Sequence, residues 1–98
     1  MIAIEIRLNG KLKAVCGAED LEQVVAVVRA DGKLGENSST NEDPEYELEC
    51  LGIHVNEKNT KEVLKWVGAK IRPSDEISFK FVETDSAHQP IDKQEIGI

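Results

Sequence analysis

The stretch that decides the fold is the opening one, in which residues 2–16 read IAIEIRLNGKLKAVC. Isoleucine occurs at every second position from Ile2 to Ile6, and this period of two predicts a strand with one buried face. A second alternation runs to Cys16, and the Asn-Gly pair at 9–10 between them is typical of a hairpin. The opening residues therefore predict two antiparallel strands at the start of a sheet.

The register of this hairpin is predicted by matching its two apolar faces. A two-residue loop at 9–10 would place Ile6 opposite Lys13, so that an apolar face would meet a polar one. A three-residue loop at 8–10, with its glycine in the left-handed region, would place Ile6 opposite Leu12. We therefore expect the bulged three-residue hairpin.

Two later segments have the apolar spacing of amphipathic helices. The first is expected at residues 20–30, with a capping box that begins at Asp20, and the second begins near Asn59. In both, apolar residues recur at intervals of three and four. These residues are Leu21, Val24, Val25 and Val28 in the first segment, and Val63, Leu64, Val67 and Ile71 in the second.

Two further strands complete the predicted sheet. Apolar residues from Tyr46 to Cys50 alternate with glutamates, and the change of phase at Gly52 predicts a bulge or bend. A last alternation runs from Ile77 to Phe81. The order β-β-α-β-α-β predicts an α+β fold of two layers, a four-stranded mixed sheet with both helices on one face.

This order resembles that of β-grasp, or ubiquitin-like, domains. The likeness rests on the hairpin at 2–16, the helix expected at 20–30 and the segment 75–81, which resembles the last strand of that fold, parallel to the first strand. Residues 66–83 also resemble small bacterial proteins in which a tryptophan helix leads into a turn and a strand, and that resemblance implies no activity. Because residues 95–98 read EIGI rather than ending in Gly-Gly, the carboxyl-activation chemistry of ubiquitin-like modifiers is not implied.

The composition is that of a single domain. Of the 98 residues, 40% are hydrophobic and 32% are charged, which is ordinary for a globular chain. We expect one domain over residues 1–84 and a C-terminal tail over 85–98 that is ordered at most in part. Residues 33–44 are polar and rich in turn formers, and they predict a loop that either binds a partner or is slack. Residues 1–5 lack the features of a signal peptide and no apolar stretch approaches the roughly 20 residues of a membrane span, so we expect the cytoplasm.

The net charge of −7 is distributed unevenly along the chain. Residues 36–57 carry seven acids and no base, whereas residues 58–72 carry five bases and one acid. An acidic segment favours association with a basic partner. The basic segment could attract phosphate weakly, but its lysines are better explained as a solvated helix face that offsets nearby glutamates.

Residues that carry chemistry are few and form no known motif. Cys16 and Cys50 each stand alone in an apolar stretch, which favours two reduced, buried thiols and leaves open a disulfide or a reactive thiol. His54 and His88 belong to no metal-binding pattern, and no phosphate-binding or nucleophile motif is present. We expect no catalytic residue, no cofactor and no metal.

These observations favour a small non-enzymatic protein-interaction module, with an acidic inhibitor or immunity-type protein as one case. It would use the acidic segment 36–49 or the margin of the second helix. The candidate partner-binding residues are Trp66, Lys61, Lys65, Lys70, Glu45, Glu47 and Glu49. Two alternatives stay open: a small-ligand binder or minor enzyme with a site at an oligomer interface, and a weak nucleic-acid binder through the basic helix. The chain is expected to be a monomer or a small homo-oligomer.

Overall fold

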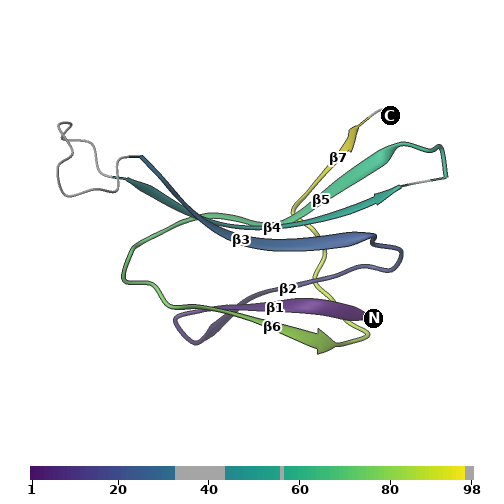
Figure 1. Cartoon of the computed structure of the whole chain (residues 1–98). Coiled ribbons are helices and arrows are strands. Elements are labelled where there is room, and N and C mark those ends of the chain that lie inside the picture. The colour runs from purple at the N-terminus through teal and green to yellow at the C-terminus, as the bar shows by residue number, and fades with distance from the viewer. Residues whose placement is uncertain (33–43, 56, 97–98) are drawn as a thin grey trace.

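The computed structural model describes residues 1–32, 44–55 and 57–96, and in these ranges its regular structure consists of strands. The strands are β1 (Ile2–Leu8), β2 (Lys11–Cys16), β3 (Gln23–Asp31), β4 (Glu45–Val55), β5 (Lys61–Ile71), β6 (Ile77–Glu83) and β7 (Asp92–Ile96). They form two antiparallel sheets, one in the order β2-β1-β6 and the other in the order β3-β4-β5-β7. Figure 1 shows the two sheets as the layers of a sandwich.

The predicted α+β class is wrong, because both segments expected to be helices are strands. The first of them forms most of β3, in which four of the nine residues are valine. Branched side chains of this kind favour strands over helices. Asp20 caps no helix; it has a positive φ of 65° in a turn, after which the N–H of Glu22 donates to the carbonyl of Ile53 at 2.9 Å.

The second expected helix is β5, which contains a β-bulge. Cys50 of β4 is paired with Val67, and the next residue, Leu51, is paired with Lys65. Trp66 therefore has no partner in β4 and is the extra residue of the bulge in β5.

This bulge explains why β5 has the spacing of a helix in the sequence. Trp66 and Val67 both face the core, so the inward-facing positions change from even to odd at the bulge, and Leu64, Val67 and Ile71 match the i, i+3, i+7 pattern. A bulge or bend was predicted near Gly52 of β4. The irregularity lies at that point of the ladder, but the facing strand carries the extra residue.

The opening hairpin has the predicted strands in a different register. Leu8 pairs with Lys11, so the loop is the two-residue turn at 9–10, whose residues have positive φ angles of 52° and 79°. The predicted three-residue loop is wrong because the bulge lies in β2 rather than in the turn. Arg7 pairs with Leu12 and Ile6 with Ala14, so Lys13 is left unpaired. Ile6 consequently meets Ala14, and the two apolar faces agree after all.

The mixed sheet implied by the β-grasp resemblance is not formed. β6 lies beside β1, as in that fold, but the two strands run antiparallel. The layer expected to contain helices is a second sheet, and residues 92–96 add β7 to its edge along β5. Within the described ranges, no helix has the length and apolar composition that crossing a membrane would require.

The core lies between the two sheets, each of which buries one face. It consists of Ile4, Ile6, Ala14 and Cys16 from the smaller sheet, and of Leu48, Cys50, Leu64, Trp66 and Val67 from the larger one. β2 packs against β4 and β5, and β1 packs against β3. β3 is an edge strand of the larger sheet, and β6 lies on the far side of β1 from β2. β6 therefore extends beyond the area that the larger sheet covers.

Candidate functional site

One side of the sandwich is closed by residues 85–91, which pass from β6 to β7 (Figure 1). The indole Nε1–H of Trp66 donates to the carbonyl of His88 at 2.8 Å. The backbone N–H of His88 donates to the carbonyl of Val15 at 2.9 Å, and the N–H of Val15 donates to Nδ1 of His88 at 3.3 Å. We call this region, formed by Trp66 and residues 85–91, the closed side.

The structure places Trp66 in the core rather than at an exposed margin. Only 4% of its surface is accessible, so it is not available as the surface anchor that the sequence suggested. Its ring occupies the space above Gly52, where an added Cβ would lie 2.7 Å from Cζ3 of the indole. Trp66 therefore seals one side of the sandwich and belongs to its architecture.

The opposite side, along β6, is open. Phe79 pairs with Ile6, and Phe81 pairs with Ile4. Residues directly opposite each other in an antiparallel pair lie on the same face, so both phenylalanines share the core-facing side of the sheet. Phe79 is nevertheless 45% exposed and Phe81 is 73% exposed, because β6 extends beyond the larger sheet.

Val28 of β3 is an exposed apolar residue on the core-facing side of the other sheet. Its pairing with the buried Leu48 places it on that side. A small hollow of about 60 Å³ lies on β6 and β1, lined by Ile4, Phe79, Lys80 and Phe81. We call Phe79, Phe81 and Val28 the open side.

β6 also has an unpaired edge. In the described part of the chain it pairs along its whole length with β1 and with no other strand. An unpaired edge presents a row of backbone N–H and C=O groups that can pair with another chain. The open side therefore combines exposed aromatic rings with a backbone edge that can extend the sheet.

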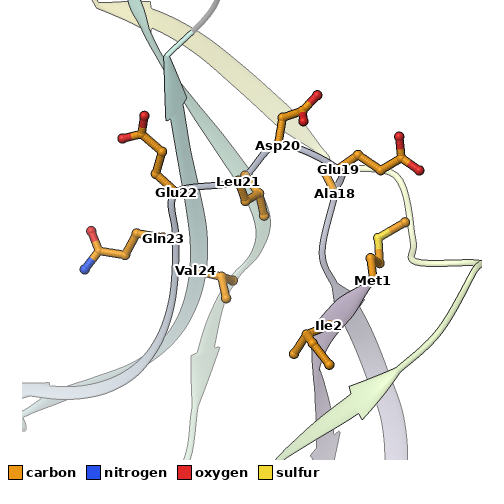
Figure 2. Close-up of a pocket in the computed structure, with 9 residues that line it drawn as sticks. All are labelled: Met1, Ile2, Ala18, Glu19, Asp20, Leu21, Glu22, Gln23 and Val24. Atoms are coloured by element: carbon orange, nitrogen blue, oxygen red, sulfur yellow. The ribbon is translucent and has the colours of Figure 1, made fainter.

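A shallow hollow of about 600 Å³ lies where the start of β1 faces the turn into β3 (Figure 2). Figure 2 shows Glu19, Asp20 and Glu22 around it, with carboxylates that point away from one another. The amino group of Met1 donates to the carbonyl of Thr84 at 3.1 Å. The polar groups around this hollow do not converge on a common point, as those of an active site would.

The glutamates predicted to bind a partner lie on the outer face of the larger sheet, where they pair with bases. Lys70 contacts Glu45 at 3.6 Å, and Arg29 contacts Glu47 at 3.6 Å. Arg29 also forms an ion pair with Glu49. Sequence reasoning missed Arg29, because its place beside the glutamates follows from β3 being a strand.

The lysines predicted on the second helix are spread along β5. Lys61 pairs with Val55 and Lys65 pairs with Leu51, on the same outer face as the glutamates. The basic helix face proposed for weak nucleic-acid binding does not exist, because the segment is a strand. The predicted offset between lysines and glutamates is present at Lys70 and Glu45.

The two cysteines, far apart in the sequence, meet in the core. Cys16 ends β2 and Cys50 lies in β4, and both are fully buried free thiols. A hydrogen bond between the two thiols, together with burial, raises the pKa of Cys16. The same hydrogen bond lowers the pKa of Cys50, because the thiolate of Cys50 would accept the proton of Cys16.

The histidines are engaged elsewhere. Nε2 of His54 lies 2.9 Å from a carboxylate oxygen of Glu62, to which Lys93 also binds at 2.8 Å. His88 belongs to the closed side. Among the residues that the structure describes, no three His, Cys, Asp or Glu side chains gather as metal ligands would. Most of the predicted loop at 33–44 and part of the acidic segment 36–49 lie outside the described residues.

Comparison with known proteins assigns no family to this antiparallel β-sandwich. No family model matches the chain, and neither a curated protein nor a solved structure matches it. Its function is therefore inferred from the geometry of the open side and the closed side.

Proposed function

We propose that this protein is a non-enzymatic protein-binding module that accepts an extended segment of a partner along the free edge of β6. The observation that carries the proposal is the exposure of Phe79 and Phe81 on a core-facing strand that no other strand covers. A partner strand would pair with the backbone of β6 and cover the two rings. Large apolar side chains exposed together on a small domain commonly mark such a binding surface.

The geometry also suggests the chemistry of the partner segment. Its side chains would alternate between the two faces of the extended sheet, so every second residue would pack against Phe79 or Phe81. Glu76 and Glu83 flank the two rings and are exposed, and the chain carries a net charge of −7. An apolar, alternating segment with basic residues at its ends is therefore favoured. This chemistry fits an acidic inhibitor of a basic protein, and the cytoplasm remains the proposed location.

Selection of displayed random peptides on the full chain tests the proposal. We expect the selected peptides to alternate apolar residues and to carry basic residues. Their affinity should fall about tenfold or more for Phe81→Ser, since one contact at the centre of an interface is lost. Leu12→Ser is the matched control, because Leu12 is 47% exposed on β2, the other edge strand of the same sheet.

Three outcomes of this selection would overturn the proposal. The first is that no peptide is selected, and the second is that Phe81→Ser leaves the affinity unchanged. The third is that Leu12→Ser weakens binding as much as Phe81→Ser does.

Light scattering separates a partner from a second copy of the chain. The proposal expects a monomer, because the edge of β6 is kept for another protein. A dimer that Phe81→Ser dissociates would instead assign this edge to self-pairing and would contradict the proposal.

A further inference from the structure

We propose that Cys16 and Cys50 form a modification site, at which exchange with a small-molecule disulfide such as oxidised glutathione converts the two thiols into a disulfide that joins the sheets. The inference is independent of the function proposed for β6. It concerns two buried nucleophiles that the binding surface does not use.

The position of the two cysteines carries this inference. Cys16 pairs with the buried Ile4 in the smaller sheet, and Cys50 pairs with Val67 in the larger one, so both side chains belong to the core-facing sides of their sheets. Both residues belong to one cluster of buried side chains in which β2 packs against β4, and the raised pKa of Cys16 agrees with a neighbouring Cys50 thiol. The two residues are 34 positions apart in the chain, and their strands belong to different sheets.

Formation of the bond needs a small approach of the two sheets. A disulfide has a sulfur–sulfur distance of about 2.0 Å, which is shorter than a hydrogen bond between thiols. Ala14 lies two residues before Cys16, and Ala26 lies opposite Cys50. Side chains as small as these allow the two backbones to lie closer together than larger side chains would in a close-packed core.

The reaction proceeds by two successive exchanges. The Cys50 sulfur, after losing its proton, attacks one sulfur of the small-molecule disulfide, and the other sulfur leaves as a thiol. The Cys16 sulfur then loses its proton and attacks the Cys50 sulfur of the mixed disulfide, which releases the second small thiol. Two electrons pass from the protein sulfurs to the small molecule, and the two protons pass to the released thiols.

Access to the pair requires local opening of the sandwich. Cys16 is the last residue of β2, an edge strand. The N–H of the neighbouring Val15 donates a hydrogen bond to His88 of the closed side. Fraying of an edge strand exposes buried groups more easily than global unfolding does. The exchange should therefore be slow in the folded chain and should leave the fold intact.

Mass spectrometry of the full chain, incubated for a day with oxidised glutathione and then quenched in acid, tests the inference. We expect a mass two hydrogens lower and one cross-linked peptide that contains both cysteines. The melting temperature should rise by about 10 °C or more and return after reduction, because the bond closes a long loop. Cys50→Ala is the control, and its melting temperature should not respond to the oxidant in this way.

Each of the other results would overturn the inference. These are free thiols after a day in a folded chain, a glutathione adduct that persists, or a disulfide between two chains. The wild-type chain alone decides the question even if Cys50→Ala fails to fold, because its oxidised and reduced forms are compared directly.

Discussion

The two sides of the sandwich differ in how much they cover an aromatic residue that faces the core. On the closed side, 4% of Trp66 is exposed, whereas on the open side 73% of Phe81 is exposed. Both face the interior of the sandwich, so the difference lies in what covers them. Residues 85–91 cover Trp66 and accept its N–H, while in the described ranges no segment covers β6. The comparison teaches that one side stabilises the fold, whereas the other is left uncovered, which is where we propose that a partner binds.

The charges around the open side agree with selective rather than indiscriminate pairing. Lys80 lies at the centre of β6 and Glu83 at its end, and charged residues on an edge strand oppose pairing with unrelated chains. β3 is the contrasting case, because its residues 24–28 form an edge with no charge. A test of the open side must therefore distinguish β6 from β3.

The largest effect is expected on the closed side, from Trp66→Ala. Removing a buried indole from the core should cost about 3–5 kcal/mol of unfolding free energy, measured by chemical denaturation. Trp66→Phe keeps most of the ring but loses the hydrogen bond to His88. Because the carbonyl of His88 is then left without its donor, the unfolding free energy should fall by about 1–2 kcal/mol. A cost below about 1 kcal/mol for Trp66→Ala would show that the closed side does not hold the sheets together.

A smaller loss of stability is expected from Gly52→Ala, beneath the same ring. The added Cβ would lie 2.7 Å from Cζ3 of Trp66 and 3.0 Å from Cδ2 of Leu21, and the packed indole cannot move away freely. Overpacking of this kind costs about 1–3 kcal/mol. Gly68→Ala is the control, because its Cβ meets the flexible end of Lys65, which can shift. A larger loss for Gly68→Ala in the same denaturation experiment would contradict this account.

Phe81→Ser on the open side should change stability little. Since most of the ring is already exposed, we expect a loss below about 1 kcal/mol in the same denaturation experiment. The comparison between the two sides would fail if this variant were as unstable as Trp66→Ala, because Phe81 would then belong to the core.

The smallest effect concerns the turn before β6 and depends on pH. The Asp75 carboxylate accepts hydrogen bonds from the N–H of Arg72 at 2.7 Å and from Asn9 at 3.0 Å, which lower its pKa below the usual 3.8. A lowered pKa means that these contacts stabilise the fold above the pKa of the unfolded chain and that this contribution is lost as pH falls through the folded pKa.

Asp75→Asn tests this dependence. The stability difference between wild type and Asp75→Asn, measured by denaturation at several pH values, should be present at pH 7 and should shrink below pH 3.8. A difference that grows in acid would contradict the assignment.

Four strands of this fold were predictable from their period of two, and the remaining structure was not, for identifiable reasons. In β3 the valines satisfy both a helical and a strand pattern, so the spacing alone does not decide. In β5 the bulge at Trp66 creates a helical spacing within a strand. A bulge in β2 likewise moved the hairpin register by one residue. The position of a bulge depends on how a strand pairs with its neighbour, and this pairing cannot be predicted from the sequence of one strand alone.

The candidate site was less predictable than the fold. Phe79 and Phe81 have the parity of core residues, and their exposure follows only from the overhang of one sheet beyond the other. Trp66 lies in the core rather than at the half-covered margin that was predicted, because its cover comes from His88, which is 22 residues away in the chain. The contact between Cys16 and Cys50 joins two sheets and leaves no local pattern in the sequence.

The central claim is that β6, rather than another edge, receives a partner strand, and amide hydrogen exchange tests it most directly. Exchange would be measured on the full chain with and without a peptide selected on it. We predict that the peptide slows exchange at the β6 amides that do not bond to β1, and that the edges at β2 and β3 are unchanged. Protection that appears along β3, with β6 unaffected, would contradict the claim.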